Sequence, residues 1–426
     1  MEQSSPDRQR IAIVGSGIAG LTCAHLLSPH REVVVFEAAE RLGGHTNTVD
    51  VDDPAAGELG VDTGFIVHNR RNYPGFTALL DDLGVATQPA EMSFAVTDRD
   101  HGLTYRATNP STIFADRRNL LRRDIWSMLA GVRRFWRDGR RLLDASAPDE
   151  ELTLGDVLST GRYSDAFVEW HLRPMIAAIW SAAPASMEDA SALATLRFLD
   201  NHGLLGLGER PQWRTVVGGS RRYVDAIVDR FEGKINTGWP VRSVARTADG
   251  GVEVATELGR DRFDAVILAC HTDQALRMLD RPTAEERSVL GDIGYQDNVA
   301  VLHTDERHLP PNRRAWAAWN VDVDRSASSD APVQVTYDLT TLQRLPTRTR
   351  YLVTLNPGGS PLDGVIETIH YSHPILDHRA RAAQRRLPGI NGADRVYFCG
   401  AWANHGFHED GVAAGREVCR LLGVDS

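Results

Sequence analysis

A glycine-rich turn near the amino terminus constrains the fold of this chain more than any other feature. The apolar run 11–14 shows no polar alternation, which is typical of a parallel strand covered on both faces. A helical segment then extends to Ser28-Pro29, and a second apolar run, 33–36, ends in Glu37. The turn between the first run and the helix reads Gly15-Ser16-Gly17-Ile18-Ala19-Gly20. This order predicts the strand, turn, helix and strand of a dinucleotide-binding domain.

Each glycine of this turn has a separate physical role in such a site. Gly15 permits the tight turn, Gly17 lets a pyrophosphate approach the backbone, and Gly20 lets helix and strand pack closely. The helix that begins near Ile18 and Ala19 would face the phosphates with free N–H groups and its positive dipole end. Glu37 is placed to accept hydrogen bonds from ribose hydroxyls. An ordinary glycine turn between core elements is the alternative.

Composition and charge exclude several classes of protein. The chain has 426 residues, 42% hydrophobic and 24% charged, which is enough for two or three domains and unlike collagen, disordered tails or small disulfide scaffolds. A formal charge of -10 gives no basic surface for wrapping nucleic acid. The four cysteines lie far apart without C-x-x-C spacing. The amino terminus has no apolar signal segment, and no stretch reaches about 18 apolar residues, so we expect a cytoplasmic protein.

Metal and hydrolase chemistry have little support in the sequence. His303, Asp305 and His308 could be written as metal ligands, but they span a predicted strand end and a Pro310-Pro311 turn rather than one helical face. No nucleophile with a paired base is recognisable. We therefore expect no bound metal.

The stretch after Glu37 distinguishes a permanently held cofactor from an exchangeable one. An arginine and a glycine pair, in Arg41-Leu42-Gly43-Gly44-His45, would let a second backbone segment close over a pyrophosphate. This R-x-G-G segment resembles the second motif of the flavin amine oxidase superfamily, which includes phytoene-type desaturases. The resemblance implies FAD. It departs at His45, where amine oxidases usually carry arginine.

Two later segments agree with the resemblance. Residues 238–244 and 251–257 predict a hairpin, and 263–270 a buried parallel strand. Residues 395–400 predict a further strand, and a helix with small residues in its first turn is predicted from Gly411, where the helix dipole could stabilise a reduced flavin. The resemblance implies that the remaining cofactor contacts come from Ala38, Arg41, Gly43, Gly44, His45, Val241, Gly400, Asp410, Gly411 and Val412.

These segments predict an α/β fold with a discontinuous, glutathione-reductase-like FAD-binding domain. Its pieces would be 1–64, 215–282 and 388–426. The blocks 65–214 and 283–387 would form a mixed helix and sheet substrate domain, with the substrate lying between the domains over the flavin.

A narrower resemblance extends from about residue 10 to 420. It rests on several short segments: Gly43-Gly44-His45-Thr46-Asn47-Thr48, 60–69, 211–213, 217–220, 316–320 and 406–411. They resemble the FAD-binding proteins associated with cyclopropane and furan fatty acid synthesis, including the amino-terminal region of the plant cyclopropane synthases. The resemblance implies a fatty acyl substrate and a neighbouring acyl-chain methyltransferase.

For such a substrate the expected reaction is dehydrogenation of a carbon–carbon bond. Hydride would pass to flavin N5, and a base or water would take a proton from the neighbouring carbon. The candidate proton acceptors are His408, His373 and His68, and the candidate substrate-lining aromatics are Trp180, Trp319, Trp402 and Phe407. Each of these side chains could instead be an ordinary core residue.

Two other functions remain open from the sequence. A flavin amine oxidase is the first, although the segment 296–301, which corresponds to the lysine-bearing strand of that family, has no lysine. The only lysine, Lys234, precedes the predicted hairpin and reads as a solvated strand end. The second is a noncatalytic flavoprotein that supports a methyltransferase.

The segment 117–141 predicts a basic amphipathic helix. It carries nine arginines against Asp124 and Asp138, interleaved with Trp126, Phe135 and Trp136. A helix of this kind can lie in an anionic lipid interface, so peripheral membrane contact is one expectation. A solvated arginine face on a globular helix is the other.

Overall fold

A parallel sheet of five strands forms the centre of the first half of the molecule. The computed structural model describes residues 8–145, 152–180, 187–323, 334–359 and 361–424. The strand order is β10-β2-β1-β14-β20. The strands are β1 (Arg10–Val14), β2 (Glu32–Phe36), β10 (Lys234–Asn236), β14 (Ala265–Leu268) and β20 (Val396–Phe398). They come from three separate chain segments, as a discontinuous domain requires. The residue limits predicted for that domain stay a prediction.

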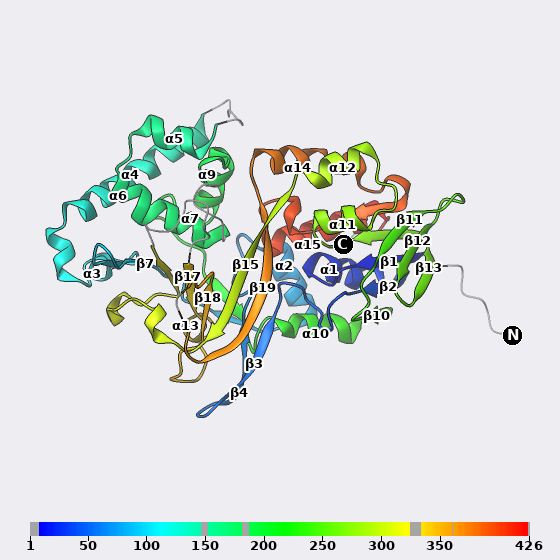
Figure 1. Ribbon diagram of the computed structural model, residues 1–426, viewed down its shortest axis with the longest axis horizontal. Helices are drawn as coiled ribbons and strands as arrows, with labels where there is room; N and C mark the ends of the chain where they lie inside the picture. Colours follow the sequence, from blue (N-terminus) through cyan, green and yellow to red (C-terminus); the bar gives the residue numbers. More distant parts are fainter. Residues whose placement is uncertain (1–7, 146–151, 181–186, 324–333, 360, 425–426) are drawn as a thin grey trace.

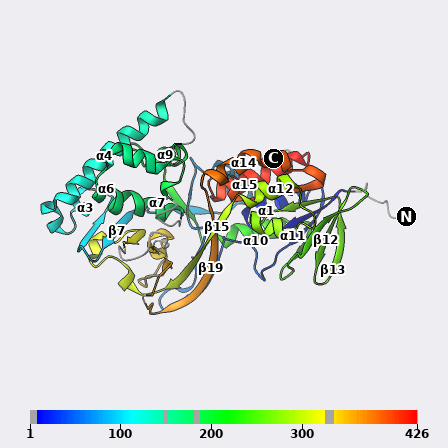
Figure 2. The same cartoon turned by 45° about the horizontal axis from the view of Figure 1, so that its top comes forward.

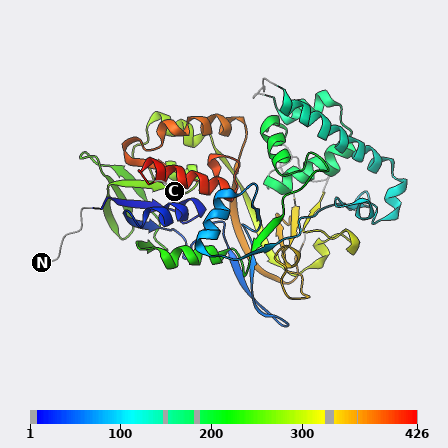
Figure 3. The same ribbon diagram turned by 180° about the vertical axis from the view of Figure 1, so that it is seen from behind.

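Both faces of this sheet are covered, which explains its unbroken apolar strands. Ile11 and Ile13 point to one face, where α1 (Ile18–Leu27) packs beside α15 (His408–Leu421). Figure 3 shows these two helices side by side, in blue and red. Ala12 and Val14 point to the other face, against the antiparallel strands β11 (Ser243–Arg246), β12 (Val252–Thr256) and β13 (Gly259–Phe263). The side chains that point to either face of the sheet are therefore buried, so consecutive residues of each strand are apolar.

Two predicted boundaries in this half were wrong. The hairpin exists as β11 and β12, but β11 begins at Ser243, because Gly238 adopts a positive φ of 68° and Pro240 lacks an N–H for pairing. The predicted strand 263–270 divides in two. Phe263 ends the antiparallel β13, and the chain then enters the parallel sheet as β14.

A second sheet of seven strands forms the other half. Its order is β19-β15-β18-β17-β16-β7-β8. The strands are β7 (Phe94–Asp98), β8 (Leu103–Arg106), β15 (Gly294–His303), β16 (Trp319–Asp322), β17 (Gln334–Asp338), β18 (Leu352–Leu355) and β19 (Val365–Ile375). The long strands β15 and β19 pair along their length and lie between the two halves of the molecule (Figure 1).

A helical layer lies over one side of this second sheet (Figures 1 and 2). It contains α4 (Arg123–Asp144), α5 (Leu154–Gly161), α6 (Asp165–Phe167), the π-helical turn Val168–Leu172, α7 (Arg173–Trp180) and α9 (Ala192–Asn201). The predicted helix 117–141 is present as α4, but its first residues differ: the extended backbone of Arg122 separates the 3-10 helix η1 (Arg117–Leu121) from α4. Within the described residues no helix is long and apolar enough to cross a membrane.

The remaining elements connect these layers. They are β3 (Thr48–Asp53), β4 (Gly57–Asp62), β5 (His68–Asn69), α2 (Pro74–Leu83), β6 (Thr87–Pro89), α3 (Pro110–Ile113), β9 (Trp213–Val216), α10 (Arg221–Arg230), α11 (Thr272–Met278), α12 (Ala284–Gly291), α13 (Leu339–Leu342) and α14 (His378–Ile390). Short 3-10 turns occupy Glu306–His308, Arg313–Ala315, Ala393–Arg395 and Ala401–Ala403.

Candidate cofactor and active site

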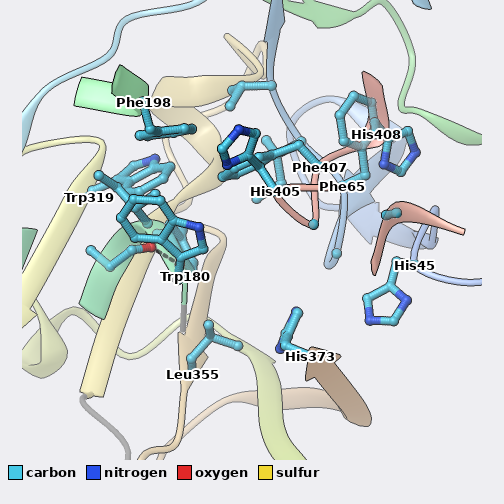
Figure 4. Close-up of a pocket in the computed structure, with 18 of the residues that line it drawn as sticks. His45, Phe65, Trp180, Phe198, Trp319, Leu355, His373, His405, Phe407 and His408 are labelled. Carbon is cyan, nitrogen blue, oxygen red and sulfur yellow. Dashed lines mark hydrogen bonds between the residues drawn. The ribbon is translucent and has the colours of Figure 1, made fainter. Parts of the chain in front are cut away.

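One large cavity joins the two halves of the molecule. Its volume is about 1810 Å³, and it extends from the glycine turn after β1 to the helices α4, α7 and α9. Figure 4 shows part of its wall, with Phe198, Trp180 and Trp319 toward one side and His45 and His408 toward the other. We call these two parts the cofactor end and the apolar passage.

The glycine turn is tightly packed at Gly15 and Gly20 and open at Gly17. A methyl group on Gly15, whose φ is 103°, would lie 2.6 Å from the Ala269 carbonyl oxygen. One on Gly20 would lie 2.0 Å from the Gly15 carbonyl oxygen, so both positions need glycine for close packing. At Gly17 nothing lies within 4 Å of an added methyl group. That open space at a helix amino terminus can admit a phosphate group.

Glu37 lies in the cavity wall at the end of β2. Its Oε2 accepts hydrogen bonds from the Ser16 N–H at 2.9 Å and the Ser16 hydroxyl at 2.6 Å, and its Oε1 accepts one from the Ala39 N–H. These bonds fix the carboxylate beside the glycine turn. Glu37 and its neighbour Ala38 both line the cavity, as expected for groups next to a ribose.

The second backbone segment closes against the glycine turn. The Gly43 N–H donates to the Ser16 carbonyl oxygen, and a methyl group on Gly44 would lie 3.2 Å from the Gly17 Cα. Gly43, Gly44 and His45 all line the cavity. Arg41 does not, since its guanidinium donates to the Thr46 carbonyl oxygen at 3.2 Å. Arg41 therefore stabilises the conformation of the segment. It does not line the cavity, in contrast to the predicted cofactor contact.

His45 carries a buried nitrogen without a partner. Its Nε2 has no hydrogen bond, and its ring stacks on Tyr371 with centroids 4.9 Å apart. Burial, reinforced by His373 and His271, holds the pKa of His45 well below its ordinary value of 6.5, so the ring is neutral at pH 7. An unsatisfied buried polar atom is costly, and a bound cofactor is a natural partner for it.

The residues of the carboxyl-terminal segment that line the cavity differ in part from the predicted cofactor contacts. Gly400, Trp402 and the segment 405–408 line the cavity, whereas Asp410, Gly411 and Val412 do not. The helix α15 begins at His408, three residues before the predicted start, because the Asp410 carboxylate accepts a hydrogen bond from the Phe407 N–H and caps the helix. All three residues are inside α15, and two of them pack toward α1 and α2: a methyl group on Gly411 would lie 2.6 Å from Ile18, and Val412 is buried.

Val241 lies at the far side of the cofactor end. It lines the cavity together with Pro240, Arg242, Gln274 and Arg277. This position is next to the carboxyl ends of β2 and β14, and the adenine contact stays a prediction. A cofactor stretched from Val241 past the glycine turn would end near His45 and Gly400.

His373, one of the three predicted proton acceptors, lines the cavity, and a hydrogen bond fixes its ring. Its Nδ1 accepts a hydrogen bond from the Asn298 side-chain amide at 2.9 Å, so its Nε2 carries the proton of the neutral ring. Asn298 in turn accepts from Asn356, which fixes the orientation of the amide. Burial lowers the pKa of His373 to about 4. In this arrangement the Nε2 of His373 can donate a hydrogen bond but cannot accept a proton directly.

His408 is engaged in a buried network. Its Nε2 lies 3.0 Å from both the Thr46 and Tyr223 hydroxyls, and its ring stacks on Phe65 at 3.5 Å. Burial lowers its pKa to about 3. His68 lies on β5, is 1% exposed and does not line the cavity. Two of the three predicted acceptors, His373 and His408, therefore share the cavity, whereas His68 lies outside its wall.

The low pKa of His408 predicts a stability change with pH. In the unfolded chain this imidazole takes up a proton near pH 6.5, whereas in the folded protein it does so only near pH 3. The unfolded state therefore binds more protons below pH 6.5, and stability falls as the pH falls. We expect His408 to contribute a loss of about 2 kcal/mol between pH 6.5 and about pH 5.

Chemical unfolding at several pH values measures this contribution. His408→Gln should show a flatter dependence of the free energy of unfolding on pH than the unmodified protein. His30→Gln, at an exposed histidine, is the control and should leave the slope unchanged. Identical slopes for the His408 variant and the unmodified protein would contradict the assignment.

The apolar passage contains three of the four predicted aromatic residues. Trp180, Trp319 and Phe407 line it, and Phe407 stacks on Phe198 with centroids 5.0 Å apart (Figure 4). Trp402 lines the cofactor end instead, where its Nε1 donates to the Cys270 carbonyl oxygen at 3.0 Å. Sequence reasoning missed several wall residues, which carry no local signal: Phe65, Phe198, His271, Leu355 and Tyr371.

His303, Asp305 and His308, which were considered as metal ligands, make other contacts in the structure. His303 Nε2 lies 2.7 Å from the Thr354 hydroxyl, and its Nδ1 accepts from the Asp305 N–H. In the described part of the chain no group of three or more histidine, cysteine, aspartate or glutamate side chains could hold a metal ion.

Comparison with known proteins settles the family. Residues 18–355 match the model of the flavin-containing amine oxidoreductases. The chain belongs to this family. It is thus an FAD-dependent oxidoreductase, and the cofactor end described above fits that cofactor: Gly17 leaves open space, the Glu37 carboxylate is fixed beside the glycine turn, and His45 Nε2 is unsatisfied. A comparison with curated protein sequences gave no match.

Solved structures share the fold of this family member across its length. A fatty acid isomerase from P. acnes that produces CLA has a TM-score of 0.71 and 16% identity, covering 98% of this chain and 100% of its own. Cyclohexylamine oxidase from Brevibacterium oxydans IH-35A has a TM-score of 0.68 and 16% identity, with 98% and 100% covered. Putrescine oxidase bound to putrescine has a TM-score of 0.66 and 15% identity, with 97% and 99% covered. Such low identities establish the fold alone.

Proposed function

We propose that this protein is an FAD-dependent dehydrogenase or desaturase of a fatty acyl chain or another long apolar substrate. The character of the apolar passage carries the proposal. Among the described residues that line the whole cavity, Glu37 is the only carboxylate, and it lies beside the glycine turn at the cofactor end. The passage itself offers aromatic and aliphatic walls that suit a long hydrocarbon. A fatty acid isomerase with the same fold agrees with this choice.

The proposed reaction removes two hydrogens from neighbouring carbons. Bound FAD supplies the acceptor for the hydride, and a proton leaves from the next carbon. Because the Nε2 of His373 carries a hydrogen, we expect this side chain to orient a water molecule that takes the proton. Trp180, Trp319 and Phe407 exclude bulk water and hold the chain in place.

Amine oxidation is the second candidate, since the family and two of the solved structures suggest it. A cationic amine is best held by a carboxylate, which the described walls of the passage lack. Lys234 is exposed at the start of β10, where its Nζ lies 5.4 Å from the Trp239 ring centroid, and β15 carries no lysine. These observations favour an apolar substrate over an amine.

Anaerobic incubation with two panels of compounds tests the proposal. Phospholipids and free fatty acids, methylated and unmethylated, form one panel, and primary and secondary amines form the other. We expect at least one acyl lipid to bleach the flavin absorption and to lose two hydrogens by mass spectrometry. Bleaching by amines alone would contradict the proposal.

A supporting role beside an acyl-chain methyltransferase is the noncatalytic alternative. It predicts that the protein binds such an enzyme and stimulates it even when its flavin cannot be reduced. Loss of all stimulation in that variant would exclude the alternative. For either role we propose a location in the cytoplasm, with peripheral contact at the inner face of the membrane.

A further inference from the structure

We propose that the surface formed by η1 and the first turns of α4 docks on an anionic lipid bilayer, with the mouth of the cavity opening beside it. We call this the η1–α4 surface and define it by Arg117, Leu120, Leu121, Arg123, Trp126 and Arg133. Uptake of an acyl chain through this mouth rests on the proposed function. The docking itself does not, because it can be measured without any reaction.

Three large apolar side chains are exposed together on this surface. Leu121 is 88% exposed, Trp126 51% and Leu120 47%. The Trp126 Nε1 donates to the Leu120 carbonyl oxygen at 3.0 Å, and its ring packs against Phe114 with centroids 5.3 Å apart. These contacts hold the apolar edge in a defined position. Exposed leucines beside a tryptophan are typical of a helix face that enters the headgroup region of a bilayer.

The charge of this surface is complementary to an anionic membrane. The segment 117–141 contains nine arginines and two aspartates, whereas the whole chain has a formal charge of -10. Arg117, Arg123 and Arg133 have no acidic partner in the described ranges, while Arg118 pairs with Asp116. Unpaired guanidinium groups on an otherwise acidic protein favour one orientation at a negatively charged bilayer.

The mouth of the cavity lies along the same helix. Trp126 and Arg133 both line the cavity and are exposed, so the cavity meets the solvent at this row of α4. Leu207, which is 90% exposed, and Arg210 are exposed lining residues from the loop after α9. Figures 1 and 2 show α3 and the start of α4 at the end of the molecule away from the parallel sheet. A docked molecule would therefore present this mouth, and not the cofactor end, to the lipid.

Flotation of the holoprotein with lipid vesicles tests the docking. One set of vesicles contains equal parts of phosphatidylglycerol and phosphatidylcholine, and the other contains phosphatidylcholine alone. We expect binding to the anionic vesicles, weakened by high salt, and at least tenfold weaker binding to the neutral ones. Arg117→Glu/Arg123→Glu should weaken anionic binding more than tenfold, because two attractions become repulsions. Leu120→Gln/Leu121→Gln should weaken it about tenfold or more, by removing the apolar contact.

A matched control changes the opposite end of the molecule. Leu258→Gln/Arg281→Glu replaces a leucine that is 71% exposed in the β12–β13 turn and an exposed arginine after α11. This variant should float like the unmodified protein. Failure of the unmodified protein to float with anionic vesicles would overturn the proposal, as would equal losses in the control. Binding of a protein or nucleic acid at this surface without vesicle binding would also overturn it.

Activity measurements separate docking from the proposed function. If the dehydrogenase proposal holds, Arg117→Glu/Arg123→Glu should lose activity on acyl chains in vesicles but keep it on a soluble short-chain acyl substrate. Neither arginine lines the cavity, so chemistry on a soluble substrate should be unaffected. If the protein oxidises no lipid at all, flotation still decides the docking proposal.

Discussion

Replacement of Gly17 by valine will leave a folded protein that is colourless and takes up FAD at least a hundredfold more weakly than the unmodified chain. The Gly17 backbone has φ -65° and ψ 176°, which valine adopts readily, and apart from its chain neighbours no residue comes within 4 Å of an added methyl group. Folding should therefore be unaffected. The branched side chain would occupy the space that the pyrophosphate needs, and a hundredfold loss corresponds to about 2.7 kcal/mol. FAD titration of the apoprotein, with thermal unfolding in parallel, measures both effects.

Gly20→Ala provides the contrasting variant. Its methyl group would lie 2.0 Å from the Gly15 carbonyl oxygen, so the helix and the turn must separate and the fold itself should be destabilised. The two variants thus separate loss of the cofactor from loss of the fold. Normal FAD uptake by Gly17→Val would show that the cofactor does not approach this turn.

Replacement of Leu355 by glutamate should lower kcat/KM for an acyl substrate by about a hundredfold or more. Leu355 is 6% exposed at the end of β18 and lines the cavity near Trp319 and His373 (Figure 4). A carboxylate there must be desolvated next to a hydrocarbon chain, which is strongly unfavourable. The same change should improve binding of a cationic amine, because it supplies the carboxylate that the passage lacks. Steady-state kinetics with both substrate classes measures this exchange.

Two further variants make the result interpretable. Leu355→Met conserves volume and polarity and should keep kcat/KM within about threefold. Met175→Glu places a carboxylate in the opposite helical wall, on α7, and should have the same effect if Leu355→Glu unfolds the sheet. Acyl turnover that survives both glutamates would show that the acyl chain does not use this passage.

The nucleotide-binding half was predictable because its signals are local. The apolar runs of β1 and β2, the glycine turn and Glu37 lie within one short segment, and each position has a backbone reason. The start of α15 was not predictable in the same way. Small residues at Gly411 suggested a helix terminus, but the Asp410 cap sets the true start at His408. Their smallness instead permits contact with α1 at Ile18.

The candidate site was predictable only in part, since much of its wall depends on tertiary contacts. His45 could be found from the second glycine motif, but its neighbours Tyr371 and His271 come from distant strands and loops. The neutral tautomer of His373 depends on Asn298, which pairs across β15 and β19. Sequence patterns do not reveal such pairs. Membership of the branch associated with cyclopropane and furan fatty acids stays a prediction, because the substrate that defines this branch has not been identified for this chain.

A crystal structure of the holoprotein soaked with a long-chain unsaturated fatty acid tests the central claim most directly. We predict density for FAD along Gly17, Glu37 and Gly44, and density for the acyl chain between Trp180 and Trp319. The chain should extend toward the mouth at Trp126. Fatty acid density confined to another surface, with the passage filled by ordered water, would contradict the account.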